Sequence, residues 1–250
     1  MTTPRSAAST QLPSTHFPDK KSNHIIYPES DGQPMADNTK QFHYIVSIKS
    51  GYDALYKDDA TVFVAGDLLW YPVEEDNKIR QAPDILIAYG RPKGDRGSYI
   101  QWLEGGIAPH VVFEILSPGN RMTEMEKKRR FYEQYGVEEY YQYDPDRGDL
   151  AGWYRREQRF EVIEAMEGWV SPRSGVRFGL EDGELVLYQP DGQRFWTYLE
   201  LLARVEVERQ RAETEHQRAE AERQRADAEH ERAERLAAHL RELGIDPDQL

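Results

Sequence analysis

The sequence predicts a mixed α/β domain in which a central sheet is flanked by helices. Short apolar runs rich in β-branched residues, at 85–89 and 111–116, are typical of strands buried on both faces. A basic segment at 123–135 follows the second run and has the spacing of an amphipathic helix. Extended segments resume after it, so strands and helix are interleaved along the chain, as in domains built on a central sheet.

The elements before this helix are short. We expect 61–65 and 67–71 to form an extended pair around Gly66 and 85–89 to form a strand. The segment 91–97 contains Pro92, Gly94 and Gly97 and predicts a loop. Pro118-Gly119-Asn120 ends the strand at 111–116, because neither proline nor glycine favours continuation of a strand.

The predicted helix at 123–135 has recognisable ends. Gly136 is well placed as its C-terminal cap. Thr123 and Glu126 have the spacing of a capping box, although the helix could equally begin a turn earlier, at Asn120. Further strands are expected at 139–143, 151–155, 160–164 and 185–188, with a turn at Asp182-Gly183.

Composition restricts the class of protein. The 250 residues include 45 acidic and 32 basic side chains, for a formal net charge of −13. This argues against a general nucleic-acid coat protein, which would carry a broad basic field, but not against an enzyme with a local basic patch. The absence of cysteine excludes disulfides and thiolate metal sites. Because there is no apolar run of about 18 residues and no signal-peptide core, we expect a soluble cytoplasmic protein.

Three regions follow from shifts in composition. Residues 1–40 are rich in polar residues and proline and predict a disordered or loosely docked arm. Residues 41–203 contain every tryptophan and form the folded body. Residues 204–250 form a heptad-repeat tail of Glu, Arg, Ala and Gln, and Gly244 with Asp246-Pro247 is expected to end its helix.

The tail has a continuous seven-residue seam. A strict heptad period predicts a left-handed coiled coil, and hence a homodimer. The second core position of the heptad, three residues after the seam position, carries glutamates. A solvated single helix held by Glu–Arg pairs is therefore an alternative. The seam consists of Val205, Ala212, Ala219, Ala226, Ala233 and Leu240.

Three residues of the body form the candidate site. Asp84 starts one predicted strand, Glu114 lies inside another, and Lys128 shares a helix face with Met125 and Tyr132. Each of these residues also has an interpretation in which it plays no part in a functional site. Asp84 could be a turn residue after a proline, Glu114 could reach solvent at a sheet edge, and Lys128 could cover apolar surface while its ammonium reaches water.

Taken together, these residue types predict a metal-dependent phosphodiesterase. A carboxylate in a buried strand is costly unless a cation pairs with it. Two carboxylates, Asp84 and Glu114, can hold one Mg²⁺ or Mn²⁺, and the backbone carbonyl of Ile115 can complete the protein ligands. Lys128 can then orient the attacking water or stabilise the developing negative charge.

The order of these residues resembles a known family. The chain carries Pro83-Asp84, Glu114-Ile115-Leu116-Ser117-Pro118, a lysine-bearing helix, and then 135–141 and Asp144-Pro145. This pattern, over about 64–146, is similar to the Uma-type family of putative restriction endonucleases, in the PD-(D/E)XK nuclease superfamily. The resemblance implies a restriction-endonuclease-like fold with Asp84 and Glu114 as the metal-binding acids.

One position departs from the superfamily pattern. The resemblance implies a lysine two residues after the glutamate, where this chain has Leu116, and it suggests that Lys128 on the next helix takes that place. Asp67 is a candidate for an additional upstream acid. A local phosphate-contacting patch could comprise the basic residues of 127–130 with Lys93 and Arg96, although Arg130 fits an ordinary charged helix face better.

The leading hypothesis is a Mg²⁺-dependent DNA endonuclease. Its substrate would be duplex DNA, and dimerisation would place two such sites on opposite strands. The second hypothesis is a non-catalytic interaction protein that keeps the nuclease fold and works through its coiled-coil tail, which the charge of −13 and Leu116 favour. A metal hydrolase acting on another substrate is a third possibility.

Overall fold

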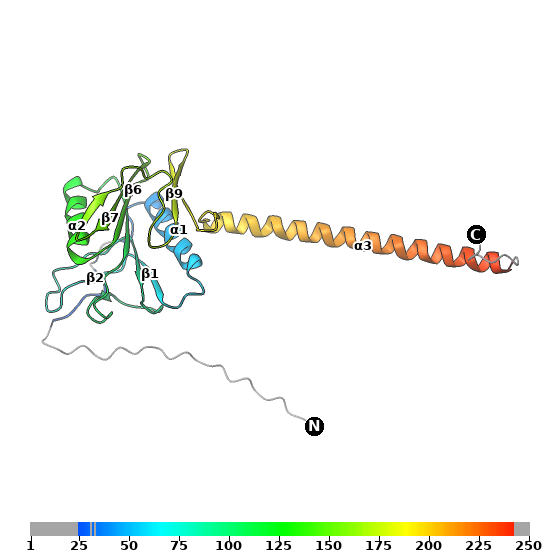
Figure 1. The fold of residues 1–250 in the computed structure, drawn as a ribbon, viewed down its shortest axis with the longest axis horizontal. Helices are drawn as coiled ribbons and strands as arrows, with labels where there is room; N and C mark the ends of the chain where they lie inside the picture. Colours follow the sequence, from blue (N-terminus) through cyan, green and yellow to red (C-terminus); the bar gives the residue numbers. More distant parts are fainter. Residues whose placement is uncertain (1–24, 31, 33, 243–250) are drawn as a thin grey trace, which may run out of the picture.

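The body of the protein is built on one six-stranded mixed sheet. The structure, a computed structural model, describes residues 25–242 except 31 and 33. In spatial order the strands are β1 (Val62–Gly66), β3 (Ile85–Tyr89), β5 (Val111–Ile115), β6 (Glu139–Asp144), β7 (Asp149–Arg156) and β8 (Arg159–Val162). β5 and β6 are parallel, whereas all other neighbouring pairs in this sheet are antiparallel. The predicted mixed α/β class is thus confirmed (Figure 1).

β5 is a fully buried strand in the interior of the sheet. All five of its residues are buried, and it lies between β3 and β6. Alternation sends Phe113 and Ile115 to one face of the sheet and Val112 and Glu114 to the other. The two hydrophobic clusters follow this division, since Phe113 belongs to one and Val112 to the other.

One helix covers each face. α1 (Thr39–Leu55) packs Ile45, Ile48 and Tyr52 against the face of Phe113. α2 (Met122–Tyr135) buries Tyr132 in the cluster on the opposite face. Glu114 therefore lies beneath α2. The sequence interpretation did not identify α1 as a helix, although its buried residues Tyr44, Ile45, Ile48 and Tyr52 have helical spacing.

α2 confirms the predicted helix but not its predicted start. It begins at Met122 after the N-cap Arg121, whose side chain makes no capping hydrogen bond. Thr123 is already inside the first turn, so it cannot form the proposed capping box, and Asn120 is not the cap either. Asn120 instead accepts a hydrogen bond from the Ser117 backbone N–H (2.7 Å), which stabilises the preceding turn. Gly136 ends the helix in the left-handed conformation at φ 100°, as expected.

Two small sheets complete the body. β2 (Trp70–Tyr71) pairs in parallel with β4 (Tyr99–Ile100), and β9 (Arg177–Glu181) forms an antiparallel hairpin with β10 (Glu184–Tyr188). The expected pairing of 61–65 with 67–71 is wrong, because β1 pairs with β3 and β2 pairs with β4. Asp67, at φ 48°, turns the chain away after β1.

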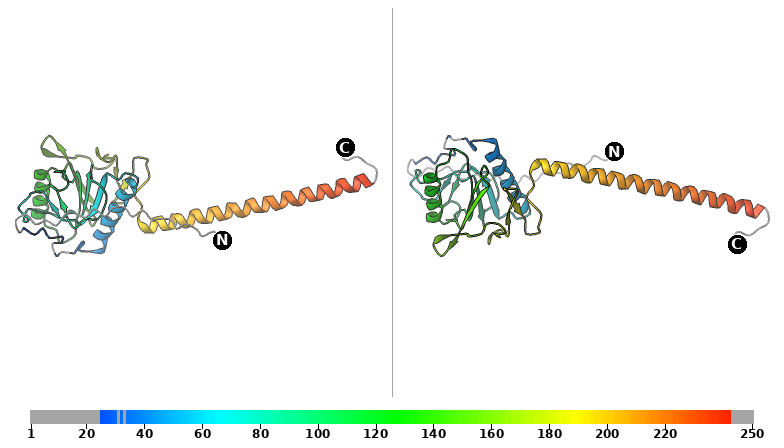
Figure 2. Two further views of the ribbon diagram at one scale, coloured as in Figure 1. Left: turned by 90° about the horizontal axis from the view of Figure 1, so that it is seen from below. Right: turned by 90° about the horizontal axis from the view of Figure 1, so that it is seen from above.

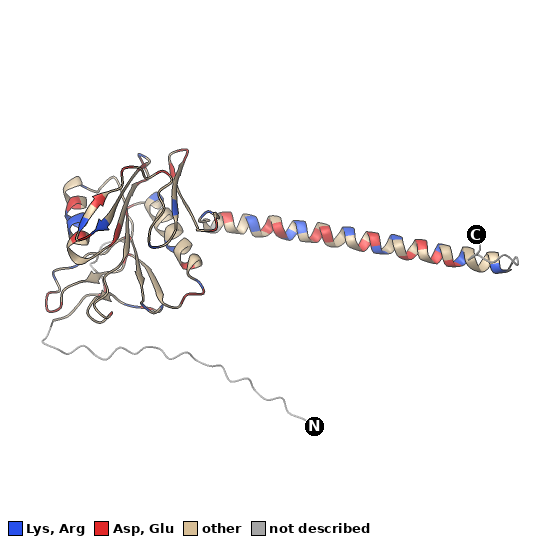
Figure 3. Ribbon diagram, in the orientation of Figure 1, with Lys and Arg blue, Asp and Glu red and all other residues tan. Residues whose placement is uncertain are grey.

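The tail is one long helix, α3 (Tyr198–Glu242), about 67 Å long at 1.5 Å per residue. It leaves the body as an extended rod (Figures 1 and 2), with acidic and basic residues alternating along it (Figure 3). Leu199 and Val205 are among its exposed apolar side chains. The predicted coiled coil remains a prediction, and the predicted stop at Gly244 lies outside the described residues.

The arm predicted at 1–40 falls mainly on residues 1–24, which also lie outside the described part. Where the description begins, Tyr27 packs edge-on against Tyr71 and Trp102. The last residues of the predicted arm, Thr39 and Lys40, already belong to α1. The division into three regions stays a prediction.

None of the described helices combines the length and hydropathy needed to cross a membrane.

Candidate active site

A row of polar residues crosses the sheet beneath α2. Phe113 pairs with Ile85, so Asp84, one residue before Ile85, comes opposite Glu114. On the other side Glu114 is in register with Gln142 of β6. Asp67 extends the row toward β1, and its backbone N–H donates to the Asp84 carbonyl at 3.1 Å. Adjacent strands therefore bring together acids that are far apart in sequence.

Glu114 is almost fully buried, with 2% of its surface exposed. Its Oε2 lies 2.8 Å from the Lys128 ammonium, and its Oε1 accepts a hydrogen bond from the Tyr132 hydroxyl. Both partners project from the face of α2 that covers the sheet. The interpretation of Glu114 as a solvent-reaching edge residue is wrong, because β5 is an interior strand and both carboxylate oxygens have protein partners.

Lys128 points into the body, as its place on the helix predicts. Only 18% of its side chain is exposed, so its ammonium does not reach out to water as the alternative interpretation proposed. Burial alone would favour the neutral amine, but the charges of Glu114 and Asp84 outweigh it and raise the pKa of Lys128. The side chain is consequently a charged ammonium between acids.

Asp84 is held by the backbone of the neighbouring strand. Its Oδ2 accepts a hydrogen bond from the Ile115 N–H at 2.6 Å. Burial and the nearby charge of Glu114 raise the pKa of Asp84 well above its usual range, although Lys128 acts in the opposite direction. One lysine thus does not compensate the acids beside it, and an additional cation would stabilise the ionised form.

Gln41 of α1 is a site residue that sequence reasoning missed. Its Nε2 donates to the Ile115 carbonyl at 2.7 Å, and its Oε1 accepts from the Asp37 N–H at 2.8 Å. Gln41 is 6% exposed. A signal was present in the sequence, because Gln41 shares the helical spacing of Tyr44, Ile45 and Ile48. A glutamine in such a stripe is costly unless it is hydrogen-bonded.

The donor set fits a hard divalent cation. Asp84 and Glu114 supply carboxylate oxygens, and the Ile115 carbonyl, which has a second lone pair beside the one used by Gln41, supplies a third oxygen. Within residues 25–242 as described, no three His, Cys, Asp or Glu side chains group closely enough to form a metal site by themselves. Mg²⁺ can bind where the protein supplies few side-chain ligands, because it keeps several waters in its coordination shell.

A buried hydroxyl adds to the polar character of this region. The Tyr140 OH is enclosed and makes no hydrogen bond within the described part of the chain. Burial raises the pKa of Tyr140 well above its usual range, and the charges of Glu114 and Asp84 raise it further. The hydroxyl therefore lies within electrostatic reach of both acids and can donate to a water or anion held beside them.

The expected phosphate-contacting patch is only partly assembled. Arg96 is buried, lies 2.6 Å from Glu104, and has its guanidinium over the Phe63 ring. Lys93 donates to the backbone carbonyl of Tyr56. These two loop residues do not join the basic face of α2, so that part of the prediction is wrong. The tertiary fold directs both toward the opposite end of β1 and β3, where they stabilise a loop.

Comparison with known proteins places the chain in a family. No match is found among curated proteins. Among solved structures, one similar chain is a putative nuclease belonging to DUF820 from Anabaena variabilis ATCC 29413, at 20% identity and a TM-score of 0.42, with 56% of this chain and 74% of that chain covered. The family model Uma2, described as "putative restriction endonuclease", matches residues 33–187. The match extends over more than half of the sequence, from just before α1 into β10, and the chain belongs to the Uma2 family.

Proposed function

We propose that the protein is a Mg²⁺-dependent DNA endonuclease whose site consists of Asp84, Glu114 and Lys128. The observation that carries this proposal is the ion pair of Lys128 with Glu114, with Asp84 opposite on the next strand. An acid pair that can hold a metal, with a lysine beside it, can supply what phosphodiester hydrolysis requires, namely neutralisation of the phosphoryl oxygens and activation of a water. Membership in a family described as putative restriction endonucleases supports the same reaction.

Each residue has a separate role in this proposal. Asp84, Glu114 and the Ile115 carbonyl would hold Mg²⁺, or Mn²⁺ in its place. The bound metal would lower the pKa of a coordinated water and polarise the phosphate. Lys128, charged beside the acids, would hydrogen-bond to a phosphoryl oxygen as negative charge develops there. Gln41 would fix the direction of the Ile115 carbonyl, and Tyr132 would fix the Glu114 carboxylate.

The test is cleavage of supercoiled plasmid and of single-stranded circular DNA by the purified protein in Mg²⁺, in Mn²⁺ and in EDTA. Asp84→Ala, Glu114→Gln and Lys128→Ala are compared with the wild type. Glu139→Gln is the matched control, because Glu139 is also 2% exposed but lies in the cluster on the α1 face, where it accepts hydrogen bonds from Tyr141 and Ser171.

We expect metal-dependent cleavage that is lost in the three site variants and kept in Glu139→Gln. Wild-type cleavage rates in Asp84→Ala or Glu114→Gln would overturn the assignment of the acids. Cleavage that persists at the wild-type rate in Lys128→Ala alone would remove the lysine from the reaction. Absence of both cleavage and metal binding in the wild type would reject the enzyme.

The proposed enzyme acts as a homodimer joined through α3. A duplex has two strands of opposite polarity, so a pair of single-strand-cutting sites related by a two-fold axis can cleave both. Val205 of the seam is exposed on α3, as are Leu201, four residues before it, and Leu236, three residues after the seam residue Ala233, and a partner helix would cover all three. An exposed apolar series on a helix that leaves the body unpartnered supports this arrangement.

A second candidate is a non-catalytic interaction protein. The observation that favours it is that both carboxylate oxygens of Glu114 have protein partners, Lys128 and Tyr132. This alternative predicts no heat of Mg²⁺ or Mn²⁺ binding in calorimetry and a partner that is lost when residues 204–250 are deleted. Metal binding that disappears in Asp84→Ala would favour the enzyme.

A further inference from the structure

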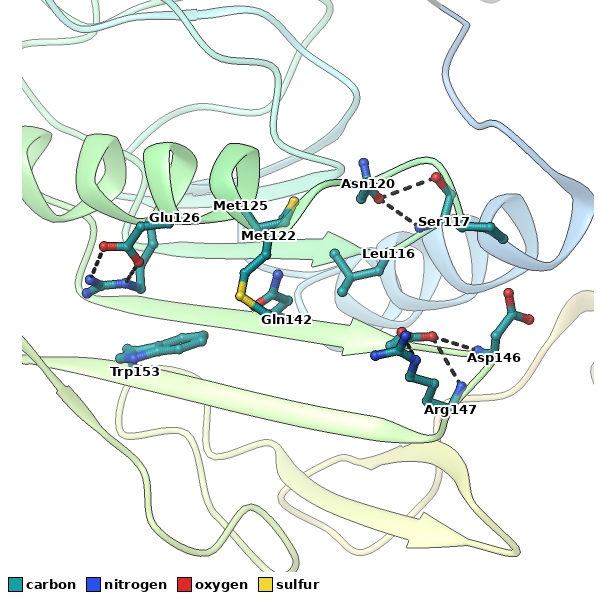
Figure 4. A pocket seen from close by; sticks show the side chains of 13 residues that line it. Leu116, Ser117, Asn120, Met122, Met125, Glu126, Gln142, Asp146, Arg147 and Trp153 are labelled. Atoms are coloured by element: carbon teal, nitrogen blue, oxygen red, sulfur yellow. Dashed lines mark hydrogen bonds and ion pairs between the residues drawn. The ribbon is translucent and has the colours of Figure 1, made fainter.

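A groove runs along the side of α2 that faces β7 and β8. Its first part is a cavity of about 650 Å³ at the start of α2 (Figure 4). Its second part, of about 730 Å³, lies beside the end of α2 and the β7–β8 turn. Arg129 lines both parts, so they adjoin each other at this side chain. We call the two parts together the α2 groove.

The first part adjoins the acid row and offers an aromatic surface. Gln142, the register partner of Glu114, lines it together with Leu116 and Met125. Trp153 also lines it (Figure 4). The indole is stacked on Tyr140 at 5.2 Å between ring centroids, with 20° between the planes. Its indole N–H makes no hydrogen bond to a described residue. The Arg129 guanidinium lies over the same ring, 5.9 Å from its centroid, so a base that stacks on Trp153 must share the indole with this arginine or displace it.

The acidic side chains of the first part are already engaged by the protein. Glu126 accepts hydrogen bonds from both Arg129 and Arg130. Asp144 accepts backbone N–H bonds from Asp146 and Arg147. The charges here largely offset one another, so this part favours an uncharged planar group over a phosphate.

The second part has the opposite character. Arg130, Arg155 and Arg159 line it together with Arg129, against the single carboxylate of Glu133. That carboxylate is committed to the backbone, since it accepts a hydrogen bond from the Phe160 N–H at 2.7 Å. This is a concentration of positive charge on a protein whose net charge is −13, and Figure 3 shows basic residues on α2 and on the strands beside it.

The arginines of the second part differ in how strongly contacts within the protein hold their side chains. Arg155 is fixed, because it donates to carbonyls at the end of α2, including that of Val137 at 2.7 Å. Arg159 forms no ion pair with any described residue. Arg130 pairs with Glu126 at 2.8 Å, but 73% of its side chain is exposed, and exposed pairs of this kind are weak. Arg130 and Arg159 can therefore contact an anion without loss of the fold.

We propose that the α2 groove binds an unpaired DNA strand, with a base stacked on Trp153 and backbone phosphates contacting Arg130 and Arg159. An aromatic platform next to a basic channel is the combination by which proteins hold single strands. A base within a duplex is covered on both faces by its neighbours and cannot lie on Trp153. The inference rests on the proposed function, because it takes DNA as the ligand, and it changes the expected duplex substrate to single-stranded or locally opened DNA.

The test is fluorescence anisotropy with a labelled single-stranded oligonucleotide and with the same strand annealed to its complement. Measurement in EDTA keeps binding separate from cleavage. The Arg130→Ala/Arg159→Ala double variant is compared with Arg177→Ala/Arg209→Ala, which removes the same charge from β9 and α3, outside the groove. Trp153→Leu is compared with Trp102→Leu, which alters a half-buried tryptophan in the cluster of Tyr27 and Tyr71.

We expect the single strand to bind at least about tenfold more tightly than the duplex, because only an unpaired base can stack. Loss of Arg130 and Arg159 should weaken binding and reduce the slope of log K against log salt by about 1.4, at about 0.7 for each phosphate contact. Trp153→Leu should weaken binding by roughly 5- to 150-fold with an unchanged slope. Trp153→Phe, which retains a ring and preserves packing on Tyr140, should lie between Trp153→Leu and the wild type.

Several results would overturn the proposal that the α2 groove binds an unpaired DNA strand. These are no binding by the wild type, equal affinity for the duplex, or an equal loss in the control double variant. The outcome is separable from that of the nuclease. Binding that maps to the groove, without metal binding and without cleavage of either the plasmid or the single-stranded circle, would keep this inference and reject the enzyme. Metal-dependent cleavage with unchanged DNA binding in the groove variants would support the enzyme and reject the groove as the DNA-binding site.

Discussion

Lys128 and Glu114 form an ion pair of 2.8 Å between α2 and the central strand β5. The lysine is 18% exposed and the glutamate 3%, measured on their side chains, so the pair is largely removed from water. Tyr132, one turn further along α2, donates to the second oxygen of the same carboxylate. This helix is consequently attached to the sheet by polar contacts at the position where the reaction is proposed to occur.

Replacement of Lys128 by Met should destabilise the fold strongly. Removing one partner of a buried pair leaves an uncompensated charge, which costs about 3–5 kcal/mol. The free energy of unfolding from urea titration measures this cost. The double variant Lys128→Met/Glu114→Gln should recover part of the loss because position 114 then no longer carries an unpaired charge. A loss below about 1 kcal/mol, the range of exposed pairs, would show that the pair is open to solvent.

Replacement of Asp84 by Asn should stabilise the metal-free protein at neutral pH. The pKa of Asp84 is raised in the folded state, so this state binds the proton more tightly than the unfolded chain does. The associated stability is fully present below the unfolded pKa of about 3.9 and is lost as the pH rises through the folded pKa. The side-chain amide of the Asp84→Asn variant does not ionise, so the gain should grow with pH across that window.

Urea titrations over a pH series in EDTA measure this difference. Asp58→Asn is the control, because the Asp58 side chain is 90% exposed and its substitution should change stability little at any pH. A wild type that becomes more stable relative to Asp84→Asn as the pH rises would reverse the predicted sign.

Mg²⁺ or Mn²⁺ should raise the melting temperature of the wild type. A ligand that binds only the folded state stabilises it by about 2.7 kcal/mol at a concentration of 100 times Kd. Binding should release protons below the folded pKa of Asp84, since this carboxyl must ionise to bind a cation. Calorimetry in two buffers of different ionisation heat detects that release. Asp84→Asn should show neither effect, and a full thermal shift in this variant would place the metal elsewhere.

Replacement of Gln41 by Leu should weaken both the fold and metal binding. The substitution removes the donor to the Ile115 carbonyl and costs about 1–3 kcal/mol, the range for a buried polar group left unsatisfied. Urea unfolding measures the first effect and Mg²⁺ titration the second. The adjacent Phe42→Leu, on the exposed side of α1, is the control. Unchanged metal affinity in a folded Gln41→Leu protein would limit Gln41 to a structural role.

Deletion of residues 204–250 should convert the proposed dimer into a monomer in sedimentation velocity. A finer test introduces charge into the seam with Ala219→Lys/Ala226→Lys, which should separate the helices because both positions face the partner. Gln217→Lys/Gln224→Lys adds the same charge on the outer side of the helix and should leave the dimer intact. Equal effects of the two double variants would exclude a coiled coil with this seam.

The sequence alone was sufficient for features that depend on local sequence pattern. The strand Ile85–Tyr89 and the buried strand around Glu114 follow from short β-branched apolar runs, and the helix face that carries Lys128 follows from a spacing of 3.6 residues. Gly136 was identifiable as the helix end because only glycine adopts its backbone conformation without strain. The acid–lysine set could be selected because buried ionised groups require partners, which is a property of the residues themselves.

Only the tertiary structure decided which residues meet. Gln41 reaches Ile115 from another element 74 residues away in sequence, and β2 pairs with β4 rather than with its neighbour β1. Arg96 pairs with Glu104 and leaves the basic surface to α2 and β8. These contacts depend on strand order and on helix placement over the sheet. Both are set by the collective burial of apolar faces, which no local spacing encodes.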